Sequence, residues 1–177
     1  FWNVTFHEVA HGLGVKQTVN GKGTVDEAMG SEKTTWEEAK ADILGLFMVS
    51  SLIDMGEITD ITKEESIATF IAGIVRSVRF GFASSHGKAN MMCYNYMEKN
   101  GAFSRNEEGK WVIDFDKAAE CINSWANLII ETQATGNVEF AKAYSAENAS
   151  IGEALAADIE KINGAGIPRD IVFDFAW

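Results

Sequence analysis

Hydrophobic residues recur at helical spacing along most of the chain, and glycines separate the segments that show this pattern. In the first segment, residues 1–13, four hydrophobic side chains share one helical face, and Gly12 and Gly14 end it. The same spacing predicts six further helices, over residues 34–55, 62–80, 86–99, 118–135, 138–146 and 150–162.

Helix starts are marked by residues that can cap a free N-terminus. Thr35 with Glu38, and Thr62 with Glu65, have the spacing of a capping box. For two later helices we expect single N-caps, from Ser84 or Ser85 and from Asp116.

Three segments do not show the helical spacing of hydrophobic residues. Residues 15–33 are polar and rich in glycine, which predicts a loop or flap. Residues 102–114 alternate around the polar turn 106–109 and predict a small β-hairpin. The tail after Pro168 is expected to be irregular or extended. No repeat or Pro/Ser-rich linker divides the chain, so we predict one mainly α domain spanning residues 1–177.

Composition excludes several classes of protein. A hydrophobic content of 46% with 11% aromatic residues is too high for a disordered chain. The net charge of −11 argues against a nucleic-acid partner, and no apolar run is long enough to cross a membrane. Cys93 and Cys121 stand apart from any CxxC pattern, so we expect buried free thiols and a reducing, cytoplasmic location.

His7, Glu8 and His11 form the pattern His-Glu-x-x-His. Four residues along a helix bring both imidazoles to one face, where they can bind one Zn²⁺. Glu8 lies too far round the helix to be an easy ligand, but it can take a proton from an activated water. The alternative is a chance grouping. The neighbouring Val9 and Ala10 favour a half-buried helix, where unsatisfied histidines would need partners.

A catalytic zinc needs a third protein ligand, and the second predicted helix offers carboxylates. Glu38 and Asp42 lie one turn apart, at the head of a column that continues through an apolar run. Glu37 lies beside them. A solvated acidic first turn, favoured by the helix dipole, is the alternative. We favour the metal site because the two histidines lack a third ligand.

These motifs resemble those of the dipeptidyl-peptidase III family of zinc metallopeptidases, which carries a histidine motif followed by an acidic motif on a separate helix. The residues that match are His7, Glu8, His11, Glu37, Glu38, Lys40, Ala41 and Asp42. Residues 85–90 are similar to the family's downstream histidine segment. Most of the family has six residues in the first motif, whereas this chain has the five-residue form.

The resemblance implies a role for each matching residue. His7, His11 and Glu38 would bind one Zn²⁺ per chain, and Glu8 would be the general base. The three remaining site residues would act around them: Glu37 and Asp42 by orienting the ligand histidines, and His86 by steadying the oxyanion.

The resemblance also implies a fold and an activity. The chain would be the helical, zinc-bearing part of a two-lobed peptidase that removes dipeptides from the amino end of oligopeptides. We therefore expect a fragment whose substrate-binding lobe lies upstream, and little turnover by the fragment alone. Two alternatives stay open: a non-catalytic binding or structural domain with a vestigial zinc site, and a zinc hydrolase for non-peptide substrates.

Overall fold

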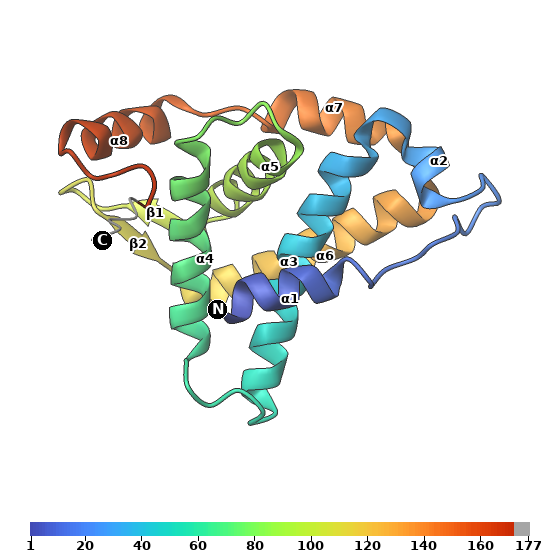
Figure 1. Ribbon diagram of the computed structural model, residues 1–177, viewed down its shortest axis with the longest axis horizontal. Coiled ribbons are helices and arrows are strands. Elements are labelled where there is room, and N and C mark those ends of the chain that lie inside the picture. Colours follow the sequence, from blue (N-terminus) through green and yellow to red (C-terminus); the bar gives the residue numbers. More distant parts are fainter. Residues whose placement is uncertain (172–177) are drawn as a thin grey trace, which may run out of the picture.

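The computed structural model describes residues 1–171 and consists mainly of helices with one small hairpin (Figure 1), which confirms the predicted fold class. The elements in chain order are α1 (Trp2–Ala10), α2 (Val25–Met29), the 3₁₀ helix η1 (Gly30–Glu32), α3 (Lys33–Asp54), α4 (Lys63–Val78), α5 (Ser85–Lys99), β1 (Phe103–Arg105), β2 (Trp111–Ile113), α6 (Phe115–Thr135), α7 (Val138–Asn148) and α8 (Glu153–Gly164). In the hairpin, Phe103 pairs with Ile113 in antiparallel register.

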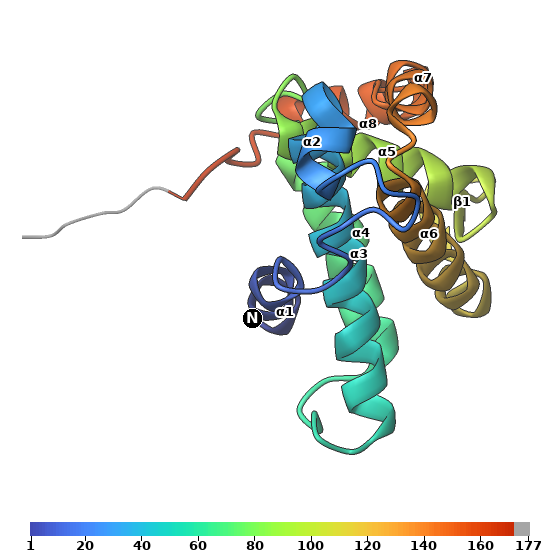
Figure 2. The same cartoon turned by 90° about the vertical axis from the view of Figure 1, so that its right-hand side faces the viewer.

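Helix α3 runs through the middle of the fold, and α1, α4, α5 and α6 pack around it (Figures 1 and 2). Trp36 is fully buried near its start, where its ring packs against Trp125 of α6 and Tyr144 of α7. Ile43, Leu46 and other apolar residues carry the core along α3. The prediction that the apolar residues after the acidic motif are buried along α3 is therefore confirmed.

Helix α1 lies across the outer side of α3, away from α6 (Figure 2). The two backbones approach closely because residue 45 is a glycine. A Cβ built at Gly45 would lie 2.8 Å from the backbone nitrogen of His7 and 3.0 Å from the carbonyl carbon of Phe6. The histidine motif is thus set directly against the helix that carries the acidic motif.

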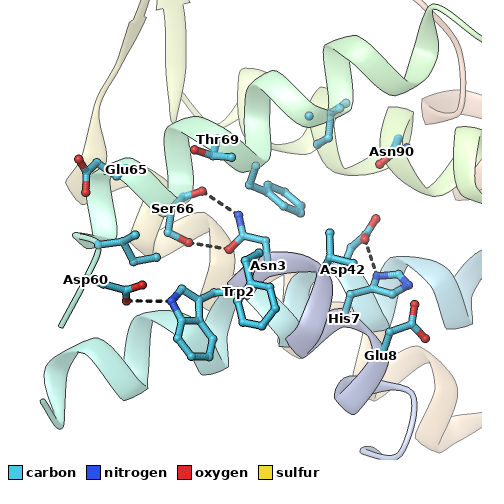
Figure 3. A pocket seen from close by; sticks show the side chains of 16 residues that line it. Trp2, Asn3, His7, Glu8, Asp42, Asp60, Glu65, Ser66, Thr69 and Asn90 are labelled. Atoms are coloured by element: carbon cyan, nitrogen blue, oxygen red, sulfur yellow. Dashed lines mark hydrogen bonds and ion pairs between the residues drawn. The ribbon is translucent and has the colours of Figure 1, made fainter. Parts of the chain in front are cut away.

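The N-terminal end of α1 is attached to α4 and to the loop before it (Figure 3). The Asn3 amide donates to the Ser66 carbonyl at 3.0 Å, and the Ser66 hydroxyl donates back to Asn3 at 2.7 Å. The Trp2 indole donates to Asp60 at 2.9 Å. Because hydrogen bonds are directional, this set fixes the orientation of α1 as well as its position.

The prediction of a loop over residues 15–33 is wrong in its second half, which forms α2 and η1. A capping box of Thr24 and Glu27 begins α2. The predicted Thr35–Glu38 capping box does not form. The backbone is already helical at Glu32, since η1 continues into α3, so α3 has no free end for Thr35 to cap.

Of the other start signals, the capping box of Thr62 and Glu65 is confirmed, and Ser84 rather than Ser85 caps α5. The cap expected at Asp116 is wrong, because the chain leaves the hairpin directly into α6 and Asp114 caps it. Both cysteines are buried free thiols, as predicted. Residues 168–171 of the predicted tail form an irregular segment, and residues 172–177 lie outside the described part of the chain.

Within residues 1–171, every helix is too short or too polar to cross a membrane.

We expect Gly45→Ala to destabilise the fold and Gly73→Ala to leave it unchanged or stabilise it. Alanine is favoured over glycine in a helix by about 1 kcal/mol at both positions. A Cβ at Gly73 meets nothing within 4 Å, whereas one at Gly45 meets the α1 backbone. Such overpacking typically costs about 1–3 kcal/mol. Urea unfolding of both variants measures the difference, and equal stabilities would contradict the close crossing.

Candidate metal centre

The crossing of α1 and α3 brings the two sequence motifs face to face. His7 lies on α1 and His11 is the C-cap residue directly after it, one helical turn farther along, with ring centroids 4.9 Å apart. Glu38 lies opposite them on α3. His7, His11 and Glu38 each place one possible ligand atom within 4.8 Å of the other two. The three residues predicted as metal ligands therefore converge.

The distances within this trio suit a tetrahedral ion. The Glu38 carboxylate oxygen Oε2 lies 3.4 Å from Nε2 of His7 and 3.8 Å from Nε2 of His11. Ligand atoms at about 2.0–2.2 Å from a tetrahedral Zn²⁺ stand roughly 3.3–3.5 Å from one another. The distance from Glu38 to His7 lies in that range, and the distance from Glu38 to His11 is slightly longer.

Among the described residues 1–171, Oε2 of Glu38 has no hydrogen-bond partner although it is buried. His86 Nε2 approaches it to 3.0 Å, but their relative orientation does not make a hydrogen bond. A buried carboxylate oxygen without a donor is unfavourable, because it has lost water and gained nothing in exchange. A cation bound to this oxygen would remove that penalty, so the residues present fit a zinc ion.

The outer ring nitrogens of both histidines are held by carboxylates. His7 Nδ1 lies 2.7 Å from Asp42, and His11 Nδ1 lies 3.1 Å from Glu37. Since an ionised carboxylate can only accept, each Nδ1 carries the proton. In the neutral imidazole the Nε2 lone pair is then left free, and it faces Glu38. Asp42 and Glu37 thus lie where the sequence predicts the orienting carboxylates.

These contacts also shift two pKa values. The hydrogen bond that His7 donates to Asp42 raises the pKa of His7 above its usual 6.5 against the opposing effect of burial, and the charges of Asp42, Glu38 and Glu8 add to the rise. Burial tends to raise the pKa of Glu37, but hydrogen bonds from Lys40 and His11 outweigh it and lower the pKa overall.

Glu8 and His86 lie at the edge of the trio. Glu8 is exposed and, with His7 and Asp42, borders a pocket of about 550 Å³ between α1 and α4 (Figure 3). His86 is the second residue of α5, and its ring lies nearly parallel to that of His7, with centroids 6.4 Å apart. Both predicted catalytic residues therefore border open space next to the candidate ligands.

Two residues that matter for this geometry were not among the predicted site residues. Gly45 sits in mid-helix, where a glycine is unfavourable, and that cost is itself a signal of close packing. Lys40 is a charged residue on a helix whose following residues are largely apolar, which favours a paired, buried charge. Either signal could have been found in the sequence.

The fold is similar to that of solved dipeptidyl-peptidase III structures. Against the structure of DPP III from Caldithrix abyssi the TM-score is 0.89 at 29% sequence identity, covering 97% of this chain and 33% of that one. Against dipeptidyl-peptidase III from Corallococcus sp. strain EGB the TM-score is also 0.89, at 30% identity, with 97% and 32% covered. The chain thus has the fold of about a third of these proteins.

Among curated proteins, Nudix hydrolase 3 of Arabidopsis thaliana is 31% identical over 175 residues, which cover 97% of this chain. The match takes in only 22% of that protein, so its name describes a chain of which this region is a small part. No protein-family model matches the chain. The name of the curated relative therefore says less about this region than the similarity to dipeptidyl-peptidase III structures does.

Without metal, the chain should lose stability as the pH rises above about 6.5, the unfolded-state pKa of histidine. The pKa of His7 is raised on folding, so its contribution is complete below the unfolded pKa near 6.5 and disappears as the pH passes the folded-state pKa. Asp42→Asn keeps an acceptor for Nδ1 but removes the charge, and should flatten this dependence.

Urea unfolding of EDTA-treated protein across this range measures the effect. The matched control is Asp54→Asn, which removes an exposed acid paired with Lys63 instead. An Asp42→Asn slope equal to that of the wild type would contradict the assignment to His7.

Proposed function

We propose that this chain is the zinc-bearing part of a peptidase of the dipeptidyl-peptidase III type, which releases dipeptides from the amino end of oligopeptides. The observation that carries the proposal is the unpartnered, buried oxygen of Glu38 opposite two Nε2 atoms. The shared fold with dipeptidyl-peptidase III structures, at 29–30% identity, supports the same function.

The chemistry would be divided between the ion and the side chains around it. A zinc ion held by His7, His11 and Glu38 would polarise the scissile carbonyl and acidify a water. Glu8 would accept the proton of the attacking water and return it to the leaving amine. Its exposed position beside His7, at the border of the pocket, supports this role.

The remaining residues would prepare the site for the transition state. Asp42 and Glu37 keep the protons of His7 and His11 on Nδ1, so the Nε2 atoms remain available. His86 has a side chain that is 66% exposed, and it would donate a hydrogen bond to the oxygen that becomes negatively charged. The nearby N-terminus of α5 would favour the same charge.

The chain spans about a third of the length of the dipeptidyl-peptidase III structures it matches. We therefore assign substrate binding to both this region and the parts of the protein that lie outside the match. Residues 1–177 alone should bind zinc but hydrolyse peptides poorly, because one side of the substrate cleft would be missing.

Metal content tests the ligand set. We expect the wild-type chain to retain about one zinc per molecule after dialysis, Glu38→Ala to lose it, and Glu8→Ala to keep it. Mass spectrometry of the metal in purified protein measures all three. Full zinc occupancy in Glu38→Ala would refute the assignment of Glu38.

Peptide hydrolysis tests the reaction. In the complete protein that carries these residues, Glu8→Gln should lower kcat by at least about 100-fold while zinc stays bound, because the proton acceptor is lost. The assay is the release of dipeptides from an oligopeptide, followed by mass spectrometry. Zinc binding without any peptide cleavage by the wild type would favour a non-peptidase role.

A further inference from the structure

Lys40 carries a positive charge into the interior directly behind the candidate metal centre. The residue is 2% exposed, and the residues beside it on α3, Ala39 and Ala41, are fully buried. Burying an ammonium group is unfavourable unless its protons are hydrogen-bonded. The contacts of Lys40 therefore indicate why a charge is present there.

Within residues 1–171, the polar contacts of the Lys40 side chain are made with Glu37, which binds the His11 ring, and with the carbonyls of His11 and Leu13. The ammonium Nζ lies 2.7 Å from Oε1 of Glu37, the same oxygen that lies 3.1 Å from His11 Nδ1. It also donates to the Leu13 carbonyl at 2.7 Å and to the His11 carbonyl at 3.4 Å. One buried group thus holds both the backbone after α1 and the carboxylate that orients the His11 ring.

The surrounding backbone leaves room for this side chain. Gly14, which follows the last carbonyl bound by Lys40, has φ of +83°, and a Cβ there would lie 3.2 Å from Cδ of Lys40. The chain therefore turns around the lysine stem with a glycine where a larger residue would be strained.

We infer that Lys40 is a positioning residue for His11, which fixes the ring through Glu37 and the main chain through the carbonyls of His11 and Leu13. This inference rests on the proposed metal centre. His7 is held by Asp42 from within α3, and no lysine of the described part of the chain contacts His7 or Asp42. Lys40 thus supports the half of the ligand set that lies at the end of α1.

If Lys40 acted only through its positive charge, its removal would strengthen metal binding, whereas the positioning role predicts weaker binding. Removing a positive charge near a cation site lowers the repulsion and strengthens metal binding. Losing the support of a ligand histidine weakens metal binding, typically by about 10–100-fold. The direction of the change in affinity in Lys40→Met therefore separates the two roles.

The experiment is titration of metal-free chain with Co²⁺, whose visible absorption reports the geometry of its ligands. For Lys40→Met we expect at least about tenfold weaker binding and altered bands. Lys40→Arg, which keeps the charge and the donors, should restore most of the affinity and the spectrum. Lys16→Met is the matched control, since the exposed Lys16 ammonium donates to the His11 carbonyl at 3.3 Å and pairs with no carboxylate of residues 1–171. This variant should bind Co²⁺ at least as tightly as the wild type.

Each outcome decides a separate point. Lys40→Met with wild-type affinity and spectrum, or with tighter binding, overturns the positioning role while the metal centre stands. A wild-type chain that binds no Co²⁺ or Zn²⁺ overturns the metal centre, and the role of Lys40 with it.

Stability is measured separately by circular dichroism of the metal-free variants. Ile129→Val, a core change in α6, shows whether lower stability alone weakens Co²⁺ binding, and a loss equal to that of Lys40→Met would overturn the proposal. If Lys40→Met does not fold, Lys40→Gln is used, because its amide can still donate to a carbonyl. Failure of both to fold would overturn the proposal in favour of a purely structural role.

Discussion

The close crossing of α1 over α3 is the contact on which the candidate site depends. The two helices carry different halves of the ligand set, and neither half can hold a metal alone. Gly45 lets the backbone of α1 approach until a Cβ would collide with it. At that separation the Glu38 carboxylate comes to 3.4 Å from Nε2 of His7 and 3.8 Å from Nε2 of His11. A wider crossing would leave the same residues present but too far apart.

The crossing also determines how charge is arranged in an acidic protein. Glu8, Glu37, Glu38 and Asp42 all lie near two histidines, which concentrates part of the net charge of −11 in one place. Asp42 and Glu37 are hydrogen-bonded to the Nδ1 atoms of the two histidines, and Glu37 is also paired with the Lys40 ammonium. Within residues 1–171, Oε2 of Glu38 has no hydrogen-bond donor. A buried carboxylate oxygen without a donor therefore lies where a divalent cation would be held.

Sequence reasoning found the elements whose signals are local. The helical periods were sufficient for most helices, and the His-Glu-x-x-His spacing placed two imidazoles on one face. Sequence reasoning failed where a neighbouring element determined where a helix begins. Thr35 has the sequence of a cap but lies inside a helix that η1 had already begun. The main-chain partners of Lys40 are 27 and 29 residues away, and its side-chain partner Glu37 lies in the same motif, so only the fold could show that they converge.

The attachment of α1 to two different helices has a mechanical consequence. Its N-terminal end is bonded to α4 through Asn3 and Ser66, while its middle rests on α3 at Gly45. Lys40 and Glu37 hold the other end of the same helix against α3, through the carbonyls of His11 and Leu13 and the His11 ring. A rotation of α4 relative to α3 would therefore strain the Asn3–Ser66 hydrogen bonds before it moved either histidine. The distances between the candidate ligands thus depend on the contact with α3 rather than on the packing of α4.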